Sequence, residues 1–320
     1  MKRILLVKTS SLGDVVHNLP VVNDIRQHYP DAEIDWVVEE GFAKIPHLHP
    51  QINHIIPVAI RRWRKQCWRM NTWHEINHCK HLLSTRAYDT IIDTQGLLKS
   101  GLITHYARGN KHGYDQASIR EPIASRFYHH HYAISYQQHA VTRNRKLVAM
   151  SLGYPIPKTR PEYGIQAGNI DLDLPKPFIM GFHATSRESK RWAESQWIKF
   201  GQHLAQLKHY LILPWGNNIE FEQATHIANR LENGIVLPKL DIAQLAAVSA
   251  QAKAVVGVDT GLTHLAVALS IPTVAIYTDT DPTMTGVMAG NQASAINLGG
   301  IAQVPEAKTI VDTLQQIVRL

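Results

Sequence analysis

Short apolar runs and amphipathic stretches alternate along the first half of the chain. Four runs, at residues 4–7, 33–38, 52–58 and 88–92, have the length and composition of strands. Between them apolar positions recur at helical intervals, and Pro20 must either kink the first helix or start a new one. Strands that alternate with helices are typical of a parallel, doubly wound sheet. The first half is therefore predicted to be Rossmann-like, but it lacks the G-x-G-x-x-G fingerprint, so no nicotinamide or flavin cofactor is expected.

A Pro- and Gly-rich stretch at residues 153–177 interrupts this pattern. The apolar run at 178–182 restarts it, and a small hydroxylated turn follows again. With 320 residues the chain is long enough for two domains. We predict an α/β fold of two Rossmann-like, doubly wound domains, residues 1–155 and 178–320, joined by a linker at 156–177. Whether the last helix packs back on the first domain is left open.

The segment that follows the first apolar run carries a candidate catalytic residue. Small hydroxylated residues, then Gly13 and Asp14, predict a tight turn and a helix that Asp14 caps. Open α/β sheets place their chemistry at the carboxyl ends of strands, so Asp14 is a candidate base. The alternative is that Asp14 caps the helix and does nothing else. A second polar turn, residues 93–96, ends the strand at 88–92 and puts Lys99 near the same kind of edge.

The clearest candidate for a phosphate site lies in the second half. An apolar run at 254–258 leads into the turn D-T-G at 259–261, and a helical pattern follows. Free backbone N–H groups at such a helix start form an anion site, and the Thr260 hydroxyl adds a donor. His264 lies about one turn further on, where it can reach a phosphate or pack against the strand.

Two other turns of the second half carry polar groups at strand ends. Thr185 and Ser186 follow one apolar run, and the adjacent cations Lys190 and Arg191 come shortly afterwards. Two cations there suit a diphosphate, although a surface cluster is equally ordinary. Glu220 follows the next apolar run, where a carboxylate often accepts hydrogen bonds from ribose hydroxyls. An exposed helical glutamate is the alternative interpretation of Glu220.

Composition narrows the class of partner and compartment. A net charge of +7 and a pI near 9.3 indicate an anionic partner, which could be nucleic acid, a phosphorylated substrate or an acidic membrane surface. Cys67 and Cys79 fit neither a zinc motif nor a disulfide framework, so a reducing, cytosolic compartment is expected. The first apolar run stops at Lys8, and no run is long enough for a signal peptide or a membrane span. The three histidines at 129–131 are interpreted as a solvated loop, without a metal site.

The segment R-R-W-R-K-Q-C-W-R, residues 61–69, is the most unusual part of the chain. Four cations in the five residues 61–65 repel one another unless solvent or an anionic ligand offsets that cost. Interleaved Trp residues suit a membrane interface, where indoles lie among headgroups while Arg and Lys bind phosphates. Nucleic acid fits the same pattern, and a plain solvated basic face is a further alternative.

Five segments taken together resemble a known enzyme family. They are K-T-S-S-L-G-D at 8–14, W-V-V-E-E-G-F at 36–42, I-P-V-A-I-R-R-W-R-K at 56–65, L-P-W-G at 213–216 and D-T-G-L-T-H at 259–264. In this order they are similar to the lipopolysaccharide heptosyltransferases, and R-R-W-R-K brings the type I enzymes nearest. The resemblance implies a GT-B architecture, in which two Rossmann-like domains face a cleft. It also implies inverting, metal-independent transfer of L-glycero-D-manno-heptose from ADP-heptose to the inner Kdo of Kdo-lipid A.

The resemblance also implies roles for individual residues. Carried over by position, Asp14 would be the base, Lys190 would meet the donor's phosphates or sugar, and Glu220 would hold the ribose. The donor site as a whole would comprise Thr185, Ser186, Lys190, Glu220, Asp259, Thr260, Gly261 and His264. The acceptor site would comprise Ser11, Gly13, Arg61, Arg62, Arg64, Lys65, Lys99 and Arg120.

The resemblance extends to cofactors, partners and location. It implies no cofactor and no metal, because ADP-heptose is a co-substrate. Kdo-lipid A and the anionic surface of the inner membrane would be the partners, with the protein peripheral on the cytoplasmic side and no role for nucleic acid. Three alternatives stay open: a heptosyltransferase of another core position, a nucleotide-sugar epimerase, and a basic nucleic-acid-binding protein.

Overall fold

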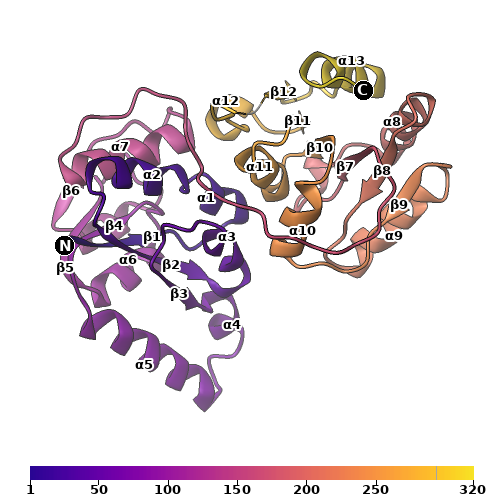
Figure 1. Ribbon diagram of the computed structural model, residues 1–320. Coiled ribbons are helices and arrows are strands. Elements are labelled where there is room, and N and C mark those ends of the chain that lie inside the picture. The colour runs from indigo at the N-terminus through magenta and orange to yellow at the C-terminus, as the bar shows by residue number, and fades with distance from the viewer. Residues whose placement is uncertain (293) are drawn as a thin grey trace. The chain divides into compact units, whose positions relative to one another are not determined.

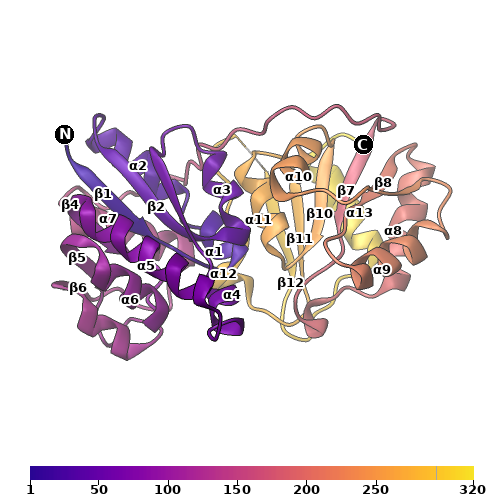
Figure 2. The same ribbon diagram turned by 90° about the horizontal axis from the view of Figure 1, so that it is seen from below.

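The computed structural model describes residues 1–292 and 294–320, and the chain forms two compact units, Met1–Ile165 and Gln166–Leu320. Within each unit, one six-stranded sheet is covered by helices (Figures 1 and 2). Every neighbouring pair of strands in both sheets is parallel. The predicted α/β class with two doubly wound parallel sheets is confirmed.

The first sheet has the strand order β3-β2-β1-β4-β5-β6. Its strands are β1 (Arg3–Val7), β2 (Glu33–Glu39), β3 (His54–Val58), β4 (Ala87–Asp93), β5 (Arg108–Tyr114) and β6 (His130–Tyr132). The central strand β1 is apolar and fully buried from Ile4 to Val7, as a strand covered on both faces must be. The predicted strands at 33–38, 52–58 and 88–92 are confirmed as β2, β3 and β4, although β3 starts only at His54.

The helices of the first unit cover both faces of this sheet. They are α1 (Leu12–Val16), α2 (Pro20–His28), α3 (Lys44–His47), α4 (Ile60–Lys65), α5 (Met70–Thr85), α6 (Leu98–Tyr106) and α7 (Ala140–Leu152), with short 3₁₀ turns η1 (Glu40–Phe42) and η2 (Pro122–Phe127). Helix α5 buries Cys79 and Leu83 against β1. Helices α2 and α7 pack together on the opposite face (Figure 1). Pro20 begins α2, so a new helix starts there and no kink is needed.

The three histidines at 129–131 do not form the solvated loop that was predicted. His130 and His131 belong to β6, which pairs in parallel with β5. The His129 N–H also donates to the Lys111 carbonyl over 2.8 Å. The three side chains are exposed, as predicted, but the loop prediction was wrong because backbone hydrogen bonding to an existing edge strand overrides a polar composition.

The second sheet has the strand order β12-β11-β10-β7-β8-β9. Its strands are β7 (Phe178–Phe182), β8 (Tyr210–Leu213), β9 (Gly234–Val236), β10 (Ala254–Val258), β11 (Thr273–Tyr277) and β12 (Ala295–Gly299). Its helical segments are η3 (Glu188–Lys190), α8 (Glu194–Gln206), α9 (Asn218–Ala228), α10 (Ile242–Ser249), α11 (Gly261–Ala268), α12 (Pro282–Thr285) and α13 (Ala307–Ile317). Counted from β7, this order repeats that of the first sheet strand for strand.

The last helix, α13, buries its apolar side in the second unit. Ile310 and Leu314 are fully buried in a cluster with Trp197 and Phe200 of α8. Helices α10 and α11 cover the other face of the sheet through residues such as Val248. None of the helices in the described part of the chain is both long and apolar enough to cross a membrane.

The stretch predicted as a linker carries neither helix nor strand from residue 153 to residue 177, all of which the structure describes. Its first part is tied to the first unit, since Asn23 Nδ2 donates to the Glu162 carbonyl over 2.8 Å. Its second part is tied to the second unit, since Gln251 Nε2 donates to the Ile170 carbonyl over 3.4 Å. The first unit accordingly extends past residue 155 to Ile165.

The two sheets reverse their strand order at equivalent places. In the first sheet the reversal lies between β1 and β4, and in the second it lies between β7 and β10. Doubly wound sheets bind ligands at the carboxyl ends of the strands that flank such a reversal. The segments that follow these four strands are those at 8–14, 94–99, 183–190 and 259–264. They contain the turns that the sequence had singled out.

Candidate functional site

Asp14 lies half-buried in the first turn of α1. The N-cap of this helix is Ser11, whose backbone N–H and Oγ–H donate to Asp14 Oδ2 over 2.8 and 3.1 Å. The prediction that Asp14 is itself the N-cap is therefore wrong, and Gly13 lies inside α1. Ser11 and Asp14 form a capping box, in which the residue three places after the N-cap accepts a hydrogen bond from it. Both bonds use one oxygen, and Asp14 Oδ1 has no partner among the described residues.

Lys8 lies behind this turn and is only 6% exposed. Its Nζ donates to the Thr94 carbonyl over 2.8 Å and so joins the turn after β1 to the turn after β4. Burial lowers the pKa of Lys8, and the negative charges of Asp14 and Asp93 act against that shift. Lys8 thus lies close enough to the Asp14 carboxylate for the two groups to interact electrostatically. The sequence motif includes this lysine but gave no reason to assign it a role.

Lys99 reaches the same turn from the start of α6. Its Nζ donates to Ser10 Oγ over 2.5 Å, which joins α6 to the first turn. Gln95 supports this geometry, because its Oε1 accepts the Ser10 N–H over 3.0 Å. Burial lowers the pKa of Lys99, whereas the negative charges of Glu39 and Asp14 raise it. Gln95 belongs to the polar turn at residues 93–96. The composition of that turn does not indicate that Gln95 holds the backbone of Ser10.

Asp93 holds the second turn in place and is fully buried. Its Oδ1 accepts the N–H groups of Gln95 and Gly96 over 2.8 and 3.1 Å, and its Oδ2 accepts the Tyr128 hydroxyl over 2.8 Å. Burial raises the pKa of Asp93, and these hydrogen bonds oppose the rise. With its oxygens used in this way, Asp93 positions the turn.

The cationic helix α4 forms one wall of a pocket of about 310 Å³ within the first unit. The residues that line it are Glu39, Glu40, Gly41, Phe42, Arg61, Arg62, Lys65 and Gln66. Three of the predicted acceptor residues are thus brought together, whereas Arg64 is exposed and does not line the pocket. Arg120 is exposed after β5, and its charge contributes to lowering the pKa of Lys8, so it belongs to the surroundings of the first turn.

Arg62 is not available in the way the sequence suggested. Its guanidinium lies 3.0 Å from Glu40 Oε2 and 2.9 Å from Glu75 Oε2. Hydrogen bonds to these two carboxylates raise the pKa of Arg62. The expectation that only solvent or an anionic ligand offsets the cations is therefore wrong for this residue. Glu40 was missed because it lies in another part of the sequence and approaches α4 only in the fold.

The segment after α4 exposes large apolar side chains. Trp68, Met70 and Trp73 are 74%, 73% and 51% exposed. They lie next to the exposed cations Lys65 and Arg69. Isolated apolar side chains are common on protein surfaces, but two indoles and a methionine within six residues make a local patch.

In the second unit, Lys190 is brought to the turn that follows β10. Its Nζ lies 2.6 Å from Asp259 Oδ2, and the Thr185 Oγ–H donates to the Asp259 carbonyl over 3.1 Å. The turns after β7 and β10 are therefore adjacent, as the reversal of strand order requires. Three of the predicted donor residues meet here. Ser186 is exposed on the same turn as Thr185.

Helix α11 begins beside this ion pair. Thr260 is its N-cap and has no side-chain capping bond, and Gly261 is its first residue. The first N–H groups of the helix and the Thr260 hydroxyl are suited to bind an oxyanion. His264 is 6% exposed, and its contact with a phosphate stays a prediction.

Glu220 lies in the first turn of α9, where its carboxylate accepts hydrogen bonds from the residues that precede the helix. Its Oε2 accepts the Gly216 N–H over 2.7 Å, and its Oε1 accepts the Asn217 Nδ2–H over 2.8 Å. The alternative interpretation of a helical glutamate thus has a structural basis. Each carboxylate oxygen can still accept a second hydrogen bond, so the ribose contact stays a prediction.

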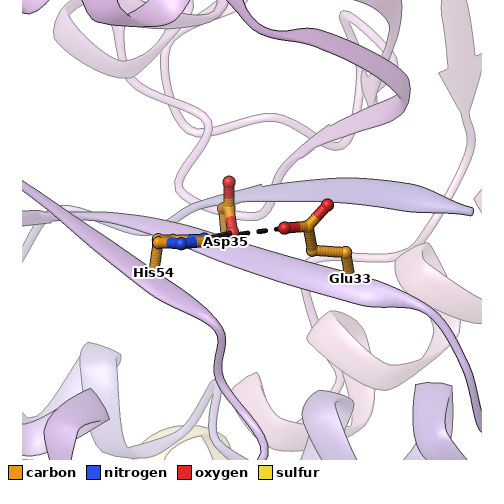
Figure 3. A group of neighbouring side chains, drawn as sticks. All are labelled: Glu33, Asp35 and His54. Atoms are coloured by element: carbon orange, nitrogen blue, oxygen red, sulfur yellow. Dashed lines mark hydrogen bonds and ion pairs between the residues drawn. The ribbon is translucent and has the colours of Figure 1, made fainter.

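Among the described residues, three side chains lie close enough together to suggest a metal site: Glu33, Asp35 and His54 (Figure 3). His54 Nδ1 lies 2.9 Å from Asp35 Oδ1 and 3.8 Å from Glu33 Oε1. Arg86 pairs with both carboxylates and Arg3 pairs with Glu33, so two cations already offset their charge. The cluster also lies at the amino ends of β2 and β3, opposite the edge of the candidate site. These residues form a structural ion-pair network and do not suit a metal ion.

Comparisons with known proteins agree with this geometry. A family model described as glycosyltransferase family 9 (heptosyltransferase) matches residues 55–314. The chain is 44% identical over 292 residues to lipopolysaccharide heptosyltransferase 1 of Pseudomonas aeruginosa, covering 91% of this chain and 82% of that one. It is similar to E. coli heptosyltransferase WaaC with ADP, with a TM-score of 0.90, 39% identity, and coverage of 99% and 100%. For WaaC with ADP-2-deoxy-2-fluoro heptose the TM-score is 0.86, the identity 39% and the coverage 98% and 99%.

Proposed function

The chain belongs to glycosyltransferase family 9, the heptosyltransferases, and we propose that it transfers L-glycero-D-manno-heptose from ADP-heptose to the inner Kdo of Kdo-lipid A. The observation that carries this proposal is the ion pair between Lys190 and Asp259 beside the start of α11. An ammonium group and the N–H groups of a helix start thus lie at one edge, an arrangement that suits the diphosphate of a nucleotide sugar. Solved structures of a relative with ADP and a fluorinated ADP-heptose support this choice of donor.

In this reaction Asp14 acts as the base. Its free oxygen Oδ1 accepts the proton of the attacking acceptor hydroxyl while the oxygen of that hydroxyl forms a bond to the anomeric carbon of heptose. The bond from that carbon to ADP breaks in the same step, so the configuration inverts. Ser11 keeps the carboxylate oriented through the hydrogen bond that Asp14 accepts from its backbone N–H.

The second unit stabilises the departing ADP. Lys190 meets the developing charge on the phosphate, and Asp259 holds the lysine in position. The N–H groups at the start of α11 add fixed positive dipoles, with Thr260 as a further donor. These groups supply the charge stabilisation that a metal ion provides in other transferases, and on this basis we propose a metal-independent reaction. Glu220 and His264 are proposed to contact the ribose and the diphosphate.

The first unit binds the anionic acceptor. The pocket beside α4 offers Arg61 and Lys65, and Lys99 lies between that pocket and the base. Guanidinium and ammonium groups are suited to the carboxylate of Kdo and the phosphates of lipid A. The exposed patch of Trp68, Met70 and Trp73 is proposed to rest on the anionic membrane surface that holds the acceptor, on the cytoplasmic side.

Family membership favours one of the three alternative functions over the other two. It argues against an epimerase, and a nucleic-acid-binding protein would have no use for the Lys190 site. A heptosyltransferase of another core position is the closest rival, because it would use the same donor. The test is mass spectrometry of products after incubation with ADP-heptose and either Kdo-lipid A or Kdo-lipid A that already carries one heptose. A single added heptose on the first acceptor alone supports the proposal, and addition to the second alone would replace it with the rival.

A further inference from the structure

Glu39 ends β2 as a buried carboxylate with an unused oxygen. It is 3% exposed, and its Oε1 accepts the Arg61 N–H over 3.0 Å at the start of α4. Its Oε2 is shielded from solvent and has no hydrogen-bond partner among the described residues. Buried polar atoms in folded proteins nearly always have a partner, and a carboxylate oxygen without one is costly. The missing partner must be a hydrogen-bond donor.

The surroundings of Glu39 restrict what that donor can be. Glu39 lines the pocket beside α4 together with Arg61 and Lys65. Arg62 contributes little net charge there, because Glu40 and Glu75 neutralise it. The pocket therefore combines positive groups with one carboxylate that needs a donor. A ligand that carries only phosphates would satisfy the cations but would be repelled by Glu39.

Glu39 is also tied to the turn that leads to the proposed base, because its backbone N–H donates to the Thr9 carbonyl over 3.1 Å. Its charge acts on Lys99, and so does the charge of Asp14. Lys99 in turn donates to Ser10, in the turn that leads to Asp14. A ligand in the pocket would thus lie near the part of the first unit that takes up the acceptor's proton.

We propose that Glu39 is a specificity-determining residue for the acceptor, and that its Oε2 accepts a hydrogen bond from a hydroxyl that does not react. Arg61 and Lys65 bind the anionic group of the same sugar. The pocket is thereby selective for a polyhydroxylated sugar acid over a phosphate or a simple carboxylate. This inference rests on the proposed function and adds a means by which the first unit recognises the sugar itself.

The first test is Glu39→Gln. The amide oxygen can still accept the Arg61 N–H, so α4 keeps its start, but the other atom becomes an amino group and the charge is lost. We expect the KM for Kdo-lipid A to rise by about tenfold or more, with kcat and the KM for ADP-heptose within about twofold of wild type. Asp31→Asn is the matched control, because it removes an exposed carboxylate before the same strand. An unchanged acceptor KM in Glu39→Gln would overturn the proposal.

The main measurement of the second test uses only the wild-type enzyme and therefore holds even if Glu39→Gln fails to fold. Kdo-lipid A analogues that each lack one non-reacting hydroxyl of the acceptor sugar are assayed with the wild-type enzyme. One of them should show about a tenfold higher KM, and the Glu39→Gln variant should show no added penalty for that analogue. If every analogue matches the parent acceptor with wild type, Glu39 does not recognise a hydroxyl. If wild type fails to use Kdo-lipid A at all, the proposed function fails instead.

Discussion

Asp259 holds Lys190 at the start of α11, with Oδ2 2.6 Å from Nζ and side chains that are 10% and 20% exposed. Because both groups are largely buried, loss of one leaves the other without a partner. We expect Asp259→Asn to raise the Kd for ADP by about tenfold, since Lys190 is then free to leave the phosphate position. Isothermal titration with ADP measures this. Asp312→Asn breaks an exposed pair with Lys308 in the same unit and serves as the control, and an equal loss in both would contradict the role of Asp259.

Removal of the proposed base should slow the reaction without affecting donor binding. In Asp14→Asn the amide oxygen can still accept the Ser11 N–H, so α1 keeps its capping box. The amide cannot accept a proton, and we expect kcat to fall by about 100-fold or more with the Kd for ADP nearly unchanged. Steady-state rates and titration with ADP together provide the measurement. A variant with near wild-type kcat would remove Asp14 from this role.

The reaction should not depend on a divalent metal ion. The proposed diphosphate site already offers Lys190 and the N–H groups of α11, and the carboxylates of Glu33 and Asp35 are neutralised by Arg86 and Arg3. We therefore expect the same rate before and after treatment with EDTA. Activity that disappears with EDTA and returns with magnesium or manganese would show that this expectation is mistaken.

The cations of α4 that form no ion pair with the described residues should govern use of the acceptor. Replacing Arg61, Arg64 and Lys65 together with Ser leaves Arg62 and its two carboxylates in place. Each lost charge is expected to raise the acceptor KM by roughly fivefold near an anionic surface, and to flatten the dependence of that KM on salt. The KM for ADP-heptose should not change. Lys308→Ser is the control, and a rise in the donor KM alone would mean that the acceptor site lies elsewhere.

The aromatic patch gives a separate expectation about membranes. Trp68→Ser with Trp73→Ser should weaken binding to vesicles of anionic phospholipid, because exposed indoles partition into the headgroup region. Sedimentation of the protein with vesicles measures this, while activity on detergent-solubilised acceptor should stay near wild type. Equal sedimentation of variant and wild type would leave the patch without a membrane role.

Stability of the first unit should fall as the pH is lowered below neutrality. Burial, together with the charge of Arg26, lowers the pKa of His49 from 6.5 to about 4. Its Nδ1 also accepts the Gln51 N–H over 3.2 Å, which requires an unprotonated nitrogen. Between these two pKa values the unfolded chain binds a proton that the folded chain does not, so stability decreases as pH falls, by up to about 1.4 kcal/mol per pH unit.

His49→Gln tests this expectation, because glutamine does not titrate. Urea unfolding at pH 6.5 and pH 4.5 should show a smaller loss of stability in the variant than in wild type. His112 also has its pKa lowered to about 4 by burial, so part of the slope should persist. An identical slope in the two proteins would mean that His49 is not responsible.

The predictions from sequence were most successful where the local pattern is also the structural cause. A buried parallel strand must be apolar on both faces, so β1 and β10 were identified from composition alone. The turns that follow them were identified because small and hydroxylated residues are needed there. The sequence correctly places Asp14 near a helix start but predicts it as the N-cap, whereas it is the third residue of the helix. Ser and Asp are both favourable N-cap residues, and only the geometry shows that Ser11 occupies that position.

Contacts between distant segments could not be predicted in the same way. The partners of Arg62 are Glu40 and Glu75, and nothing near Arg62 in the sequence indicates that Glu40 would approach it. The support that Gln95 gives to Ser10 depends on β1 and β4 lying side by side. Glu39 belongs to the motif W-V-V-E-E-G-F, but the sequence assigns it no role. Its unused oxygen is recognised only once burial and hydrogen bonding are known.

The second sheet repeats the strand order of the first, and each unit has its own reversal point. As a result, residues 1–165 carry the proposed base and the proposed acceptor pocket, whereas residues 166–320 carry the proposed nucleotide site. Specificity for the acceptor and specificity for the donor can therefore evolve independently. A lineage can acquire a new acceptor through substitutions in the first unit while its dependence on one activated sugar is inherited unchanged. Grafting the first unit of a relative with a different acceptor onto this second unit would reveal whether the two traits are in fact separable.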